Sequence, residues 1–256
     1  MRSFIAFFKK EFLESFRSGK LILLGILFFA FGVMNPAIAK LTPWIIEILS
    51  EDLAQSGMTV TSVTVDALTS WTQFFKNIPM ALIAFILIYS SIFTKEYEAG
   101  TLVLMLTKGV LRYKVLFAKS SLVMLLWTSG YWLCFAVTYG YNAYFWDNSV
   151  ATGLMTATVN WWLFGIFALS LTILFSVISK NYSGVLLGTG AVVLSSYLLG
   201  LLPKISKYAP TALMKSSLLL IGQESAENYI EAVVVTVLLI IFCISVSIPV
   251  FNKKQL

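Results

Sequence analysis

The sequence predicts an all-α, polytopic membrane protein with six transmembrane helices, and three observations support this fold class. The 256 residues are 59% hydrophobic and 12% charged, with a mean hydropathy of +0.87, which is typical of multi-span membrane proteins. Charged residues gather in short segments that separate six apolar runs. Each run approaches or exceeds the ~20 residues that a helix needs to cross ~30 Å of hydrocarbon. The spans are expected at Leu21–Ala39, Ile78–Thr94, Val115–Gly140, Ala151–Ser179, Ser183–Leu202 and Ile230–Phe251.

The basic residues divide unequally between the two sides of the membrane that six spans define. Five of the 18 fall on one side, and the remaining 13 fall on the side that holds both termini. Because basic loops stay in the cytoplasm, we expect both termini to be cytoplasmic. The protein should therefore lie in a cell membrane, which we take to be a bacterial plasma membrane. Attraction to anionic lipid headgroups accounts for the net charge of +6, so we expect membrane lipids and no nucleic acid as partners.

Residues 1–20 are predicted to form an interfacial amphipathic helix that precedes the first span. A phenylalanine recurs every four residues and makes one apolar stripe, with charged residues opposite it. Such a helix lies in the plane of the headgroups. Two interpretations stay open: an anchor that orients the first span, or a docking element for a cytosolic partner. The stripe consists of Phe4, Phe8, Phe12 and Phe16.

Residues 21–252 are expected to form the transmembrane domain. It includes a cytoplasmic loop at 95–114 and two outer loops at 40–77 and 203–229. Helical spacing of apolar residues from Trp44 onward predicts a second interfacial helix in the first outer loop. The second outer loop is predicted to hold a short helical hairpin that dips toward the membrane.

The residue types that are absent exclude several kinds of chemistry. The chain has no histidine, which excludes His-based catalytic triads, His-ligated metals and a His general base. No G-x-x-x-x-G-K-[ST] segment is present, so ATP would have to be bound by a partner. Every Asp and Glu lies in a loop or near a span end, which disfavours an ion-coupled carrier. We therefore expect no catalytic residue, metal site or cofactor in this chain.

The cytoplasmic loop carries the most informative segment. Residues 95–102 read Lys-Glu-Tyr-Glu-Ala-Gly-Thr-Leu, and Leu104, Leu106, Arg112 and Lys119 follow. Glu96 and Glu98 are two residues apart, which places them on different faces of a helix and excludes a paired acid and base. One interpretation is a solvated acidic helix start, favoured by the helix dipole. The other is a surface that the loop offers to a cytosolic protein.

This order of residues resembles the loop after the second span in permease subunits of type-2 ATP-binding-cassette (ABC) exporters. That loop typically reads acidic-x-acidic-x-Gly-Thr, then leucine positions, a basic residue and a lysine that enters the third span. The chain departs from the pattern at Lys108-Gly109, where many members carry a proline. The resemblance implies a dimer of permease chains, identical or paired with a sister. It also implies a separate cytosolic ABC ATPase subunit that binds ATP and magnesium.

The same resemblance implies roles for individual residues. In the family this loop supplies a coupling helix that sits in a cleft of the ATPase, which assigns ATPase coupling to Glu96, Glu98, Gly100, Thr101 and Arg112. Spans one, two and five usually surround the translocation path, so Gly184 and Gly188 become candidates for the dimer interface or the pathway. A small-xxx-small pair lets another helix approach closely, and packing against a span of the same chain is the alternative.

The expected activity is export of a hydrophobic or amphipathic substrate, such as a peptide, a lipid-like or a drug-like molecule. A path lined by Phe, Trp and Leu with few charges suits such substrates. A protein from another class, a non-transporting membrane immunity, sensor or assembly protein, is the alternative function. The two differ in their response to ATP.

Overall fold

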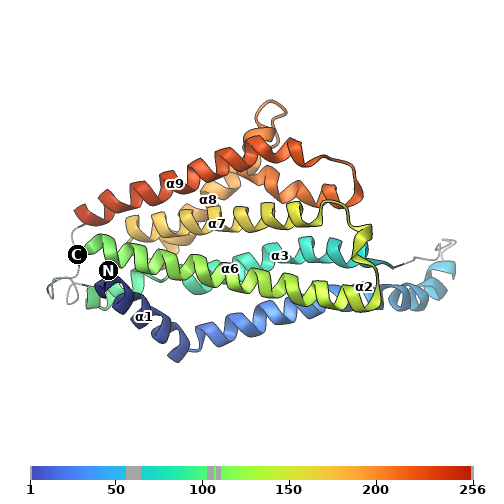
Figure 1. Ribbon diagram of the computed structural model, residues 1–256, viewed down its shortest axis with the longest axis horizontal. Coiled ribbons are helices and arrows are strands. Elements are labelled where there is room, and N and C mark those ends of the chain that lie inside the picture. Colours follow the sequence, from blue (N-terminus) through green and yellow to red (C-terminus); the bar gives the residue numbers. More distant parts are fainter. Residues whose placement is uncertain (1, 56–64, 103–106, 108–110, 255–256) are drawn as a thin grey trace.

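The computed structural model describes residues 2–55, 65–102, 107 and 111–254, which form helices and the turns between them (Figure 1). Within these ranges there is no strand, and six helices are long and apolar enough to cross a membrane. This confirms the predicted all-α, six-span fold class. The six helices are α2 (Lys20–Gln55), α3 (Ala67–Tyr89), α6 (Arg112–Phe145), α7 (Leu154–Ile178), α8 (Tyr182–Leu199) and α9 (Ile230–Lys253).

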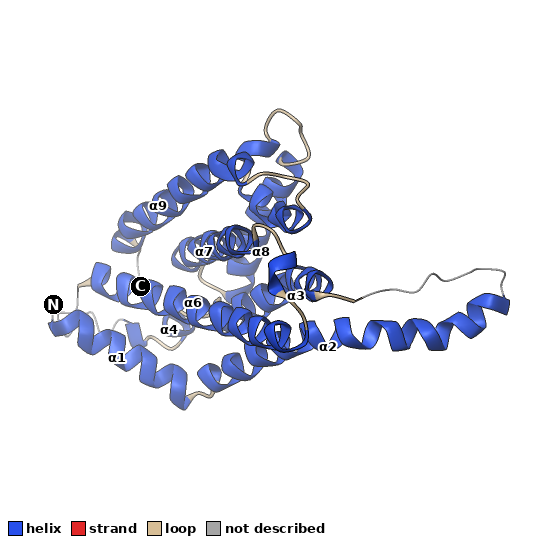
Figure 2. Ribbon diagram, turned by 45° about the vertical axis from the view of Figure 1, so that its right-hand side comes forward, coloured by secondary structure: helices blue, strands red, loops and turns tan. Residues whose placement is uncertain are grey.

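The core of the bundle lies among α3, α6 and α7, and α2, α8 and α9 surround these three helices (Figures 1 and 2). Helix α2 packs against α6 and α3, while α8 and α9 pack against α7. Aromatic rings fill the centre: the Trp127 ring lies 5.8 Å from Phe28 and 5.7 Å from Phe85, centroid to centroid. Gly165 of α7 faces the same tryptophan, and a Cβ there would lie 2.3 Å from the indole. The close contact between α6 and α7 therefore requires glycine at this position.

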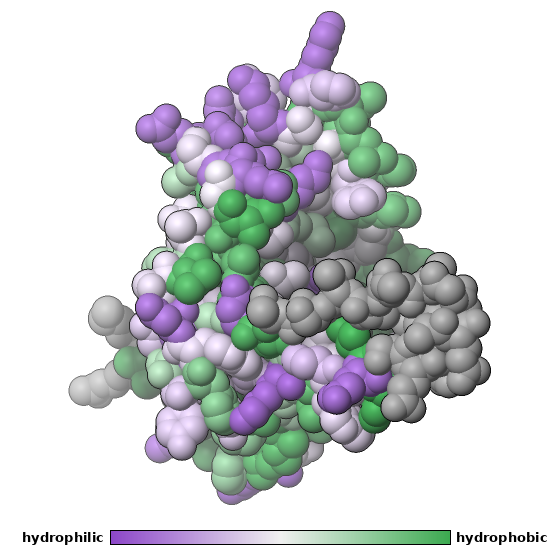
Figure 3. Space-filling model, turned by 90° about the vertical axis from the view of Figure 1, so that its right-hand side faces the viewer, coloured by the Kyte–Doolittle hydropathy of each residue, from purple (hydrophilic) through white to green (hydrophobic). Residues whose placement is uncertain are grey.

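The described ends of the chain lie at one end of the bundle (Figure 1). We call it the basic end because Lys10, Lys20, Lys95 and Lys119 line one cavity there and Lys254 lies beside Tyr97. It holds two short elements, α1 (Arg2–Arg17) and α4 (Thr94–Glu98). The opposite end holds four 3₁₀ helices. Figure 3 views this opposite end, where hydrophilic residues gather in the upper part beside apolar ones. The 3₁₀ helices are η1 (Asn148–Val150), η2 (Ser206–Tyr208), η3 (Pro210–Ile221) and η4 (Ala226–Tyr229).

The described part of the predicted outer loop at 40–77 is mostly helix. Helix α2 continues to Gln55 and includes the segment from Trp44 that was expected to be a separate interfacial helix. Helix α3 begins at Ala67, where the Asp66 side chain caps it by accepting a hydrogen bond of 2.9 Å from the Thr69 amide. Residues 56–64 of the predicted loop lie outside the described residues.

Helix α2 passes through Pro36, which lies inside the span predicted at Leu21–Ala39. A proline inside a helix removes one N–H donor and leaves the carbonyl four residues earlier without its partner. That carbonyl belongs to Gly32, and the Thr138 hydroxyl of α6 donates to it at 3.0 Å. A neighbouring helix thus satisfies the freed group, which is how membrane helices tolerate proline.

The predicted outer loop at 203–229 is largely helical, but as the 3₁₀ helices η2, η3 and η4. Helix η3 packs against α7 and buries Leu213 and Leu219. Its left-handed end at Gly222, with φ +67°, needs a residue without a Cβ. The position of this segment relative to a membrane stays a prediction.

Candidate functional site

The face of helix α1 that packs against the bundle carries both apolar and polar residues. Phe7, Glu11 and Ser15, spaced four residues apart, are all buried. The phenylalanine stripe predicted from sequence is offset from this face by one residue. Phe4 and Phe8 pack partly against the core, whereas Phe12 and Phe16 remain 38% and 51% exposed. The helix therefore presents a carboxylate inward and aromatic rings outward.

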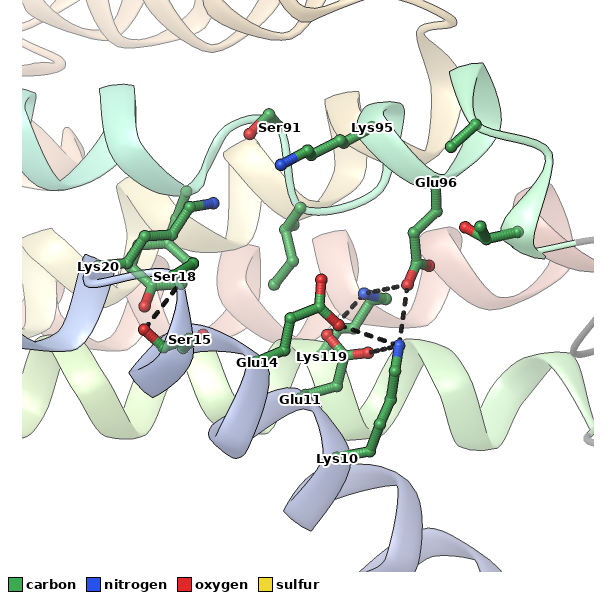
Figure 4. A pocket seen from close by; sticks show the side chains of 14 residues that line it. Lys10, Glu11, Glu14, Ser15, Ser18, Lys20, Ser91, Lys95, Glu96 and Lys119 are labelled. Atoms are coloured by element: carbon green, nitrogen blue, oxygen red, sulfur yellow. Dashed lines mark hydrogen bonds and ion pairs between the residues drawn. The ribbon is translucent and has the colours of Figure 1, made fainter.

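A group of charges with a buried centre joins α1 to α4 and α6 (Figure 4). At its centre is Lys119, 2% exposed, whose Nζ donates to Glu11 Oε2 at 2.7 Å and lies 3.1 Å from Glu96 Oε1. Lys10 Nζ lies 2.9 Å from Glu11 Oε1, 3.2 Å from Glu14 Oε2 and 3.4 Å from Glu96 Oε1. We call these five residues, Lys10, Glu11, Glu14, Glu96 and Lys119, the ion cluster.

The members of the ion cluster depend on one another for their charge. Burial works against the charged form of Lys10, but hydrogen bonding and attraction from Glu11 and attraction from Glu96 raise its pKa above the ordinary value. Burial likewise opposes ionisation of Glu14, yet the hydrogen bond from Lys10 lowers the pKa of this carboxyl below its ordinary value. Because a buried ion without its partner is costly, α1, α4 and α6 are held together by charge as well as by apolar contact.

The predicted coupling residues of α4 have different surroundings. Glu96 is buried and ion-paired, while Glu98 is exposed, which confirms that they lie on different faces. The interpretation of Glu96 as a solvated acidic residue is wrong, because Lys119 and Lys10 hold it inside. Gly100 follows α4 with φ +64°, a left-handed conformation that favours glycine after a helix. Thr101 is half-buried, and residues 103–106 and 108–110, including Leu104, Leu106, Lys108 and Gly109, lie outside the described residues.

Arg112 binds the end of α9. Its guanidinium donates to the carbonyl oxygens of Phe251 at 2.9 Å and Lys254 at 2.7 Å. Lys254 in turn donates to the Val177 carbonyl at the end of α7, at 2.6 Å, and its Nζ lies 3.9 Å from the Tyr97 ring centroid. Basic side chains thus satisfy the last carbonyls of two helices and complement their dipoles. Arg112 and Lys254 join α4, α6, α7 and α9 at the basic end.

The glycine pair of α8 faces its own chain. A Cβ at Gly188 would lie 2.4 Å from the Phe175 ring of α7. A Cβ at Gly184 would lie 2.9 Å from Asn181 Oδ1, which accepts the Gly184 amide at the helix start. The described contacts therefore match the alternative in which these glycines pack within the chain. A neighbouring face of α8 is exposed, with Leu187 at 73%.

Sequence reasoning missed two features of the buried polar structure. It gave no role to Glu11, and it treated Lys119 only as a residue that enters the third span. A signal was present, since Lys119 lies within an apolar run and Glu11 shares a helical face with Phe7. The second feature is a chain of hydrogen bonds that we call the amide chain: Asn77 Nδ2 donates to Asn35 Oδ1 at 2.9 Å, and Asn35 Nδ2 donates to Thr138 Oγ1 at 3.2 Å.

Three cavities bear on function. A polar cavity of about 380 Å³ lies at the basic end, between the ion cluster and the ends of α2 and α3. An apolar cavity of about 520 Å³ lies among α7, α8 and α9, and another of about 250 Å³ lies among α3, α7 and α8. Within the described ranges, no group of His, Cys, Asp and Glu is arranged to hold a metal ion.

Comparison with protein families gives one finding. A family model described as "ABC-2 family transporter protein" matches residues 5–254, which is nearly the whole chain. No curated protein and no solved structure matches the sequence.

Proposed function

This chain belongs to the ABC-2 family of transporter proteins, and on that premise we propose that it is the permease subunit of an exporter driven by a separate cytosolic ATPase. The family match over residues 5–254 carries the proposal. The six apolar helices agree with a multi-pass membrane subunit. ATP and magnesium would be bound by the ATPase, and this chain would contribute no catalytic residue.

We propose that the ATPase contacts the exposed side of α4 and the turn that follows it, where Glu98, Gly100 and Thr101 lie. A bound partner can shift the permease only if its contacts differ between two states. Glu96 would then act from the buried side by passing the movement of α4 to Lys119 of α6 and to Glu11 of α1. Separation of these charges would leave buried ions unpaired, so the three elements are expected to move together.

Arg112 has a second part in this proposal. Its hydrogen bonds to the end of α9, together with Lys254 and Tyr97, support movement of the coupling segment with the last span. In the proposed orientation the basic end faces the cytoplasm. Helix α1 would lie in the headgroup layer with Phe12 and Phe16 directed outward, since aromatic rings favour that position.

The substrate is proposed to be hydrophobic or amphipathic. The apolar cavity of about 520 Å³ supports this, because Phe167, Leu171, Phe175 and Phe242 are among the residues that line it. Its size lies within the range of ligand pockets. The exposed leucines of α8 would face lipid or a second permease chain, which the family implies as a homodimer or a heterodimer.

Co-purification tests the coupling proposal. The full chain is isolated from its native membrane, and co-purifying proteins that carry a P-loop motif are identified. Glu98→Ala should weaken retention of the ATPase several-fold, since it removes a charge from the proposed contact. Glu227→Ala is the matched control, because this exposed glutamate lies at the opposite end of the bundle.

Absence of any P-loop partner, together with vesicles of the chain that do not respond to ATP, would contradict the proposal. That result would favour a non-transporting immunity, sensor or assembly protein. Equal retention of the ATPase by the Glu98→Ala and Glu227→Ala chains would contradict the assigned contact.

A further inference from the structure

The polar cavity at the basic end is lined by more lysines than the ion cluster contains. Its walls carry four lysines, Lys10, Lys20, Lys95 and Lys119, and three carboxylates, those of Glu11, Glu14 and Glu96. Glu11 and Glu14 come from α1 and Glu96 from α4, and all three pair with Lys10 or Lys119. The other two lysines line the same cavity without a carboxylate partner.

Lys20 and Lys95 approach the cavity from two different elements (Figure 4). Lys20 is the first residue of α2, and Lys95 lies on α4. Neither makes an ion pair within the described part of the chain; Lys20 Nζ lies 5.4 Å from the Tyr89 ring centroid. Two like charges that share a cavity repel each other, and an anion between them would remove that repulsion.

An independent observation points to the same ligand chemistry. Tyr89 is among the residues that line this cavity and is 2% exposed. Its hydroxyl oxygen is buried beside the Ser15 side chain and makes no hydrogen bond of normal geometry. A buried hydroxyl normally finds a partner, because leaving it unpaired is costly. A hydroxyl donor on a residue of the same cavity wall as two ammonium groups suits an anion with several acceptor oxygens.

The position of the cavity suits an anionic group that a membrane lipid carries. It lies where α2 begins and α3 ends, and both helices are long and apolar enough to cross a membrane. In the proposed orientation this end of the bundle would meet the headgroup layer. We infer that this cavity binds a phosphate group, held by Lys20, Lys95 and the Tyr89 hydroxyl and presented by a phospholipid or by a soluble phosphate ester. The volume of about 380 Å³ is sufficient for a headgroup. The inference does not depend on transport or on an ATPase.

Lipid binding to the purified full chain tests the inference. Delipidated protein in detergent is titrated with dioleoyl phosphatidylglycerol and, separately, with dioleoylglycerol, which has the same acyl chains without phosphate. Bound lipid is counted by native mass spectrometry. The phosphate-bearing lipid should bind at least about tenfold more tightly, since charge-assisted hydrogen bonds are the strong ones. Glycerol 3-phosphate, added alone and as a competitor, tests the soluble source.

Two variants and one control isolate the site. Lys20→Gln with Lys95→Gln should weaken binding of the phosphate-bearing ligand about tenfold or more. Tyr89→Phe should weaken it several-fold while leaving the thermal midpoint of the lipid-free protein unchanged or higher, because it removes only an unpaired hydroxyl. Lys9→Gln with Lys253→Gln removes the same charge from exposed positions at the basic end and should change binding less than twofold.

Each outcome bears on the inference. Phosphatidylglycerol binding that weakens in both cavity variants supports a lipid source, and glycerol 3-phosphate binding with the same ranking of variants supports a soluble one. Equal affinity of the wild type, the cavity variants and the control pair would overturn the inference. Equal binding of phosphatidylglycerol and dioleoylglycerol, without binding of glycerol 3-phosphate, would also overturn it.

Discussion

Helix α6 carries one buried polar cluster near each of its ends, and the two differ in chemistry. Lys119 belongs to the ion cluster and Thr138 to the amide chain, about 28 Å apart at 1.5 Å per residue. The ion cluster joins α6 to the shorter helices α1 and α4, whereas the amide chain joins the long helices α2, α3 and α6. Charge is therefore used where short elements attach to the bundle, and neutral hydrogen bonds are used where spans cross.

This difference in chemistry implies a difference in the free energy that is lost when each cluster is broken. A buried ion pair that loses one partner leaves an uncompensated charge, which costs several kcal/mol. Hydrogen bonds between membrane helices contribute less, on average about 0.6 kcal/mol, because the separated helices find other partners. We accordingly expect α1 and α4 to detach from the bundle together when the ion cluster is broken. The contacts among α2, α3 and α6 should instead tolerate small rearrangements.

The largest effect is expected for Lys119→Met, which leaves Glu11 and Glu96 with only Lys10. We expect a loss of about 3–5 kcal/mol of stability, measured as a lower thermal midpoint in detergent. Addition of Glu11→Gln should restore part of the loss, because it removes one unpaired carboxylate. Lys9→Met, at an exposed position of α1, is the control. Equal midpoints for Lys119→Met and Lys9→Met would show that the ion cluster does not hold α1.

Substitutions of the two glutamates of α4 should distinguish an effect on stability from an effect on binding of the ATPase. Glu96→Gln should cost about 1–3 kcal/mol, since it weakens buried charged contacts. Glu98→Gln should stay within about 0.5 kcal/mol of the wild type, because an exposed side chain contributes little. Thermal midpoints and ATPase retention are measured on the same preparations. A stability loss in Glu98→Gln as large as that in Glu96→Gln would reverse the assigned roles.

Asn35→Leu removes the central member of the amide chain, so Asn77 Nδ2 loses its acceptor and Thr138 Oγ1 loses a donor, while Thr138 still donates to the Gly32 carbonyl. We expect a loss of about 1–2 kcal/mol, smaller than that of Lys119→Met. Asn228→Leu, at an exposed asparagine of the opposite end, provides the matched control in the same thermal assay. If Asn35→Leu were as damaging as Lys119→Met, the contrast between charged and neutral clusters would fail.

The smallest effect is expected for Glu14→Gln, since Glu14 is exposed and pairs with Lys10 one turn away. The pair should contribute about 0.3–0.5 kcal/mol. The pKa of Glu14 is lowered in the folded protein, so its contribution is present above its ordinary pKa of 4.5 and is lost as pH falls through the folded value. The difference in midpoint between wild type and variant should therefore shrink below about pH 4. If the difference in midpoint grew as the pH fell, the Glu14–Lys10 pair would not stabilise the folded protein in the way predicted.

Local features of the sequence determined the six spans, the amphipathic α1 and the separation of Glu96 from Glu98 onto different faces. Apolar length and helical periodicity depend on residues within one or two turns, so they can be read directly. The ends of α7, α8 and α9 lie within a few residues of their predicted positions for the same reason.

Only the tertiary structure decided which residues meet. Glu11 and Lys119 are 108 residues apart, and Asn35 and Thr138 are 103 apart, so no local pattern pairs them. The carbonyl that Pro36 leaves unpaired in α2 accepts from the Thr138 hydroxyl of another helix, and Gly188 packs against Phe175 of α7. A buried charge, or a carbonyl that a proline leaves unpaired, requires a partner. Which residue meets that need is decided by how the helices pack, because hydrogen bonds and ion pairs act only over a few ångströms.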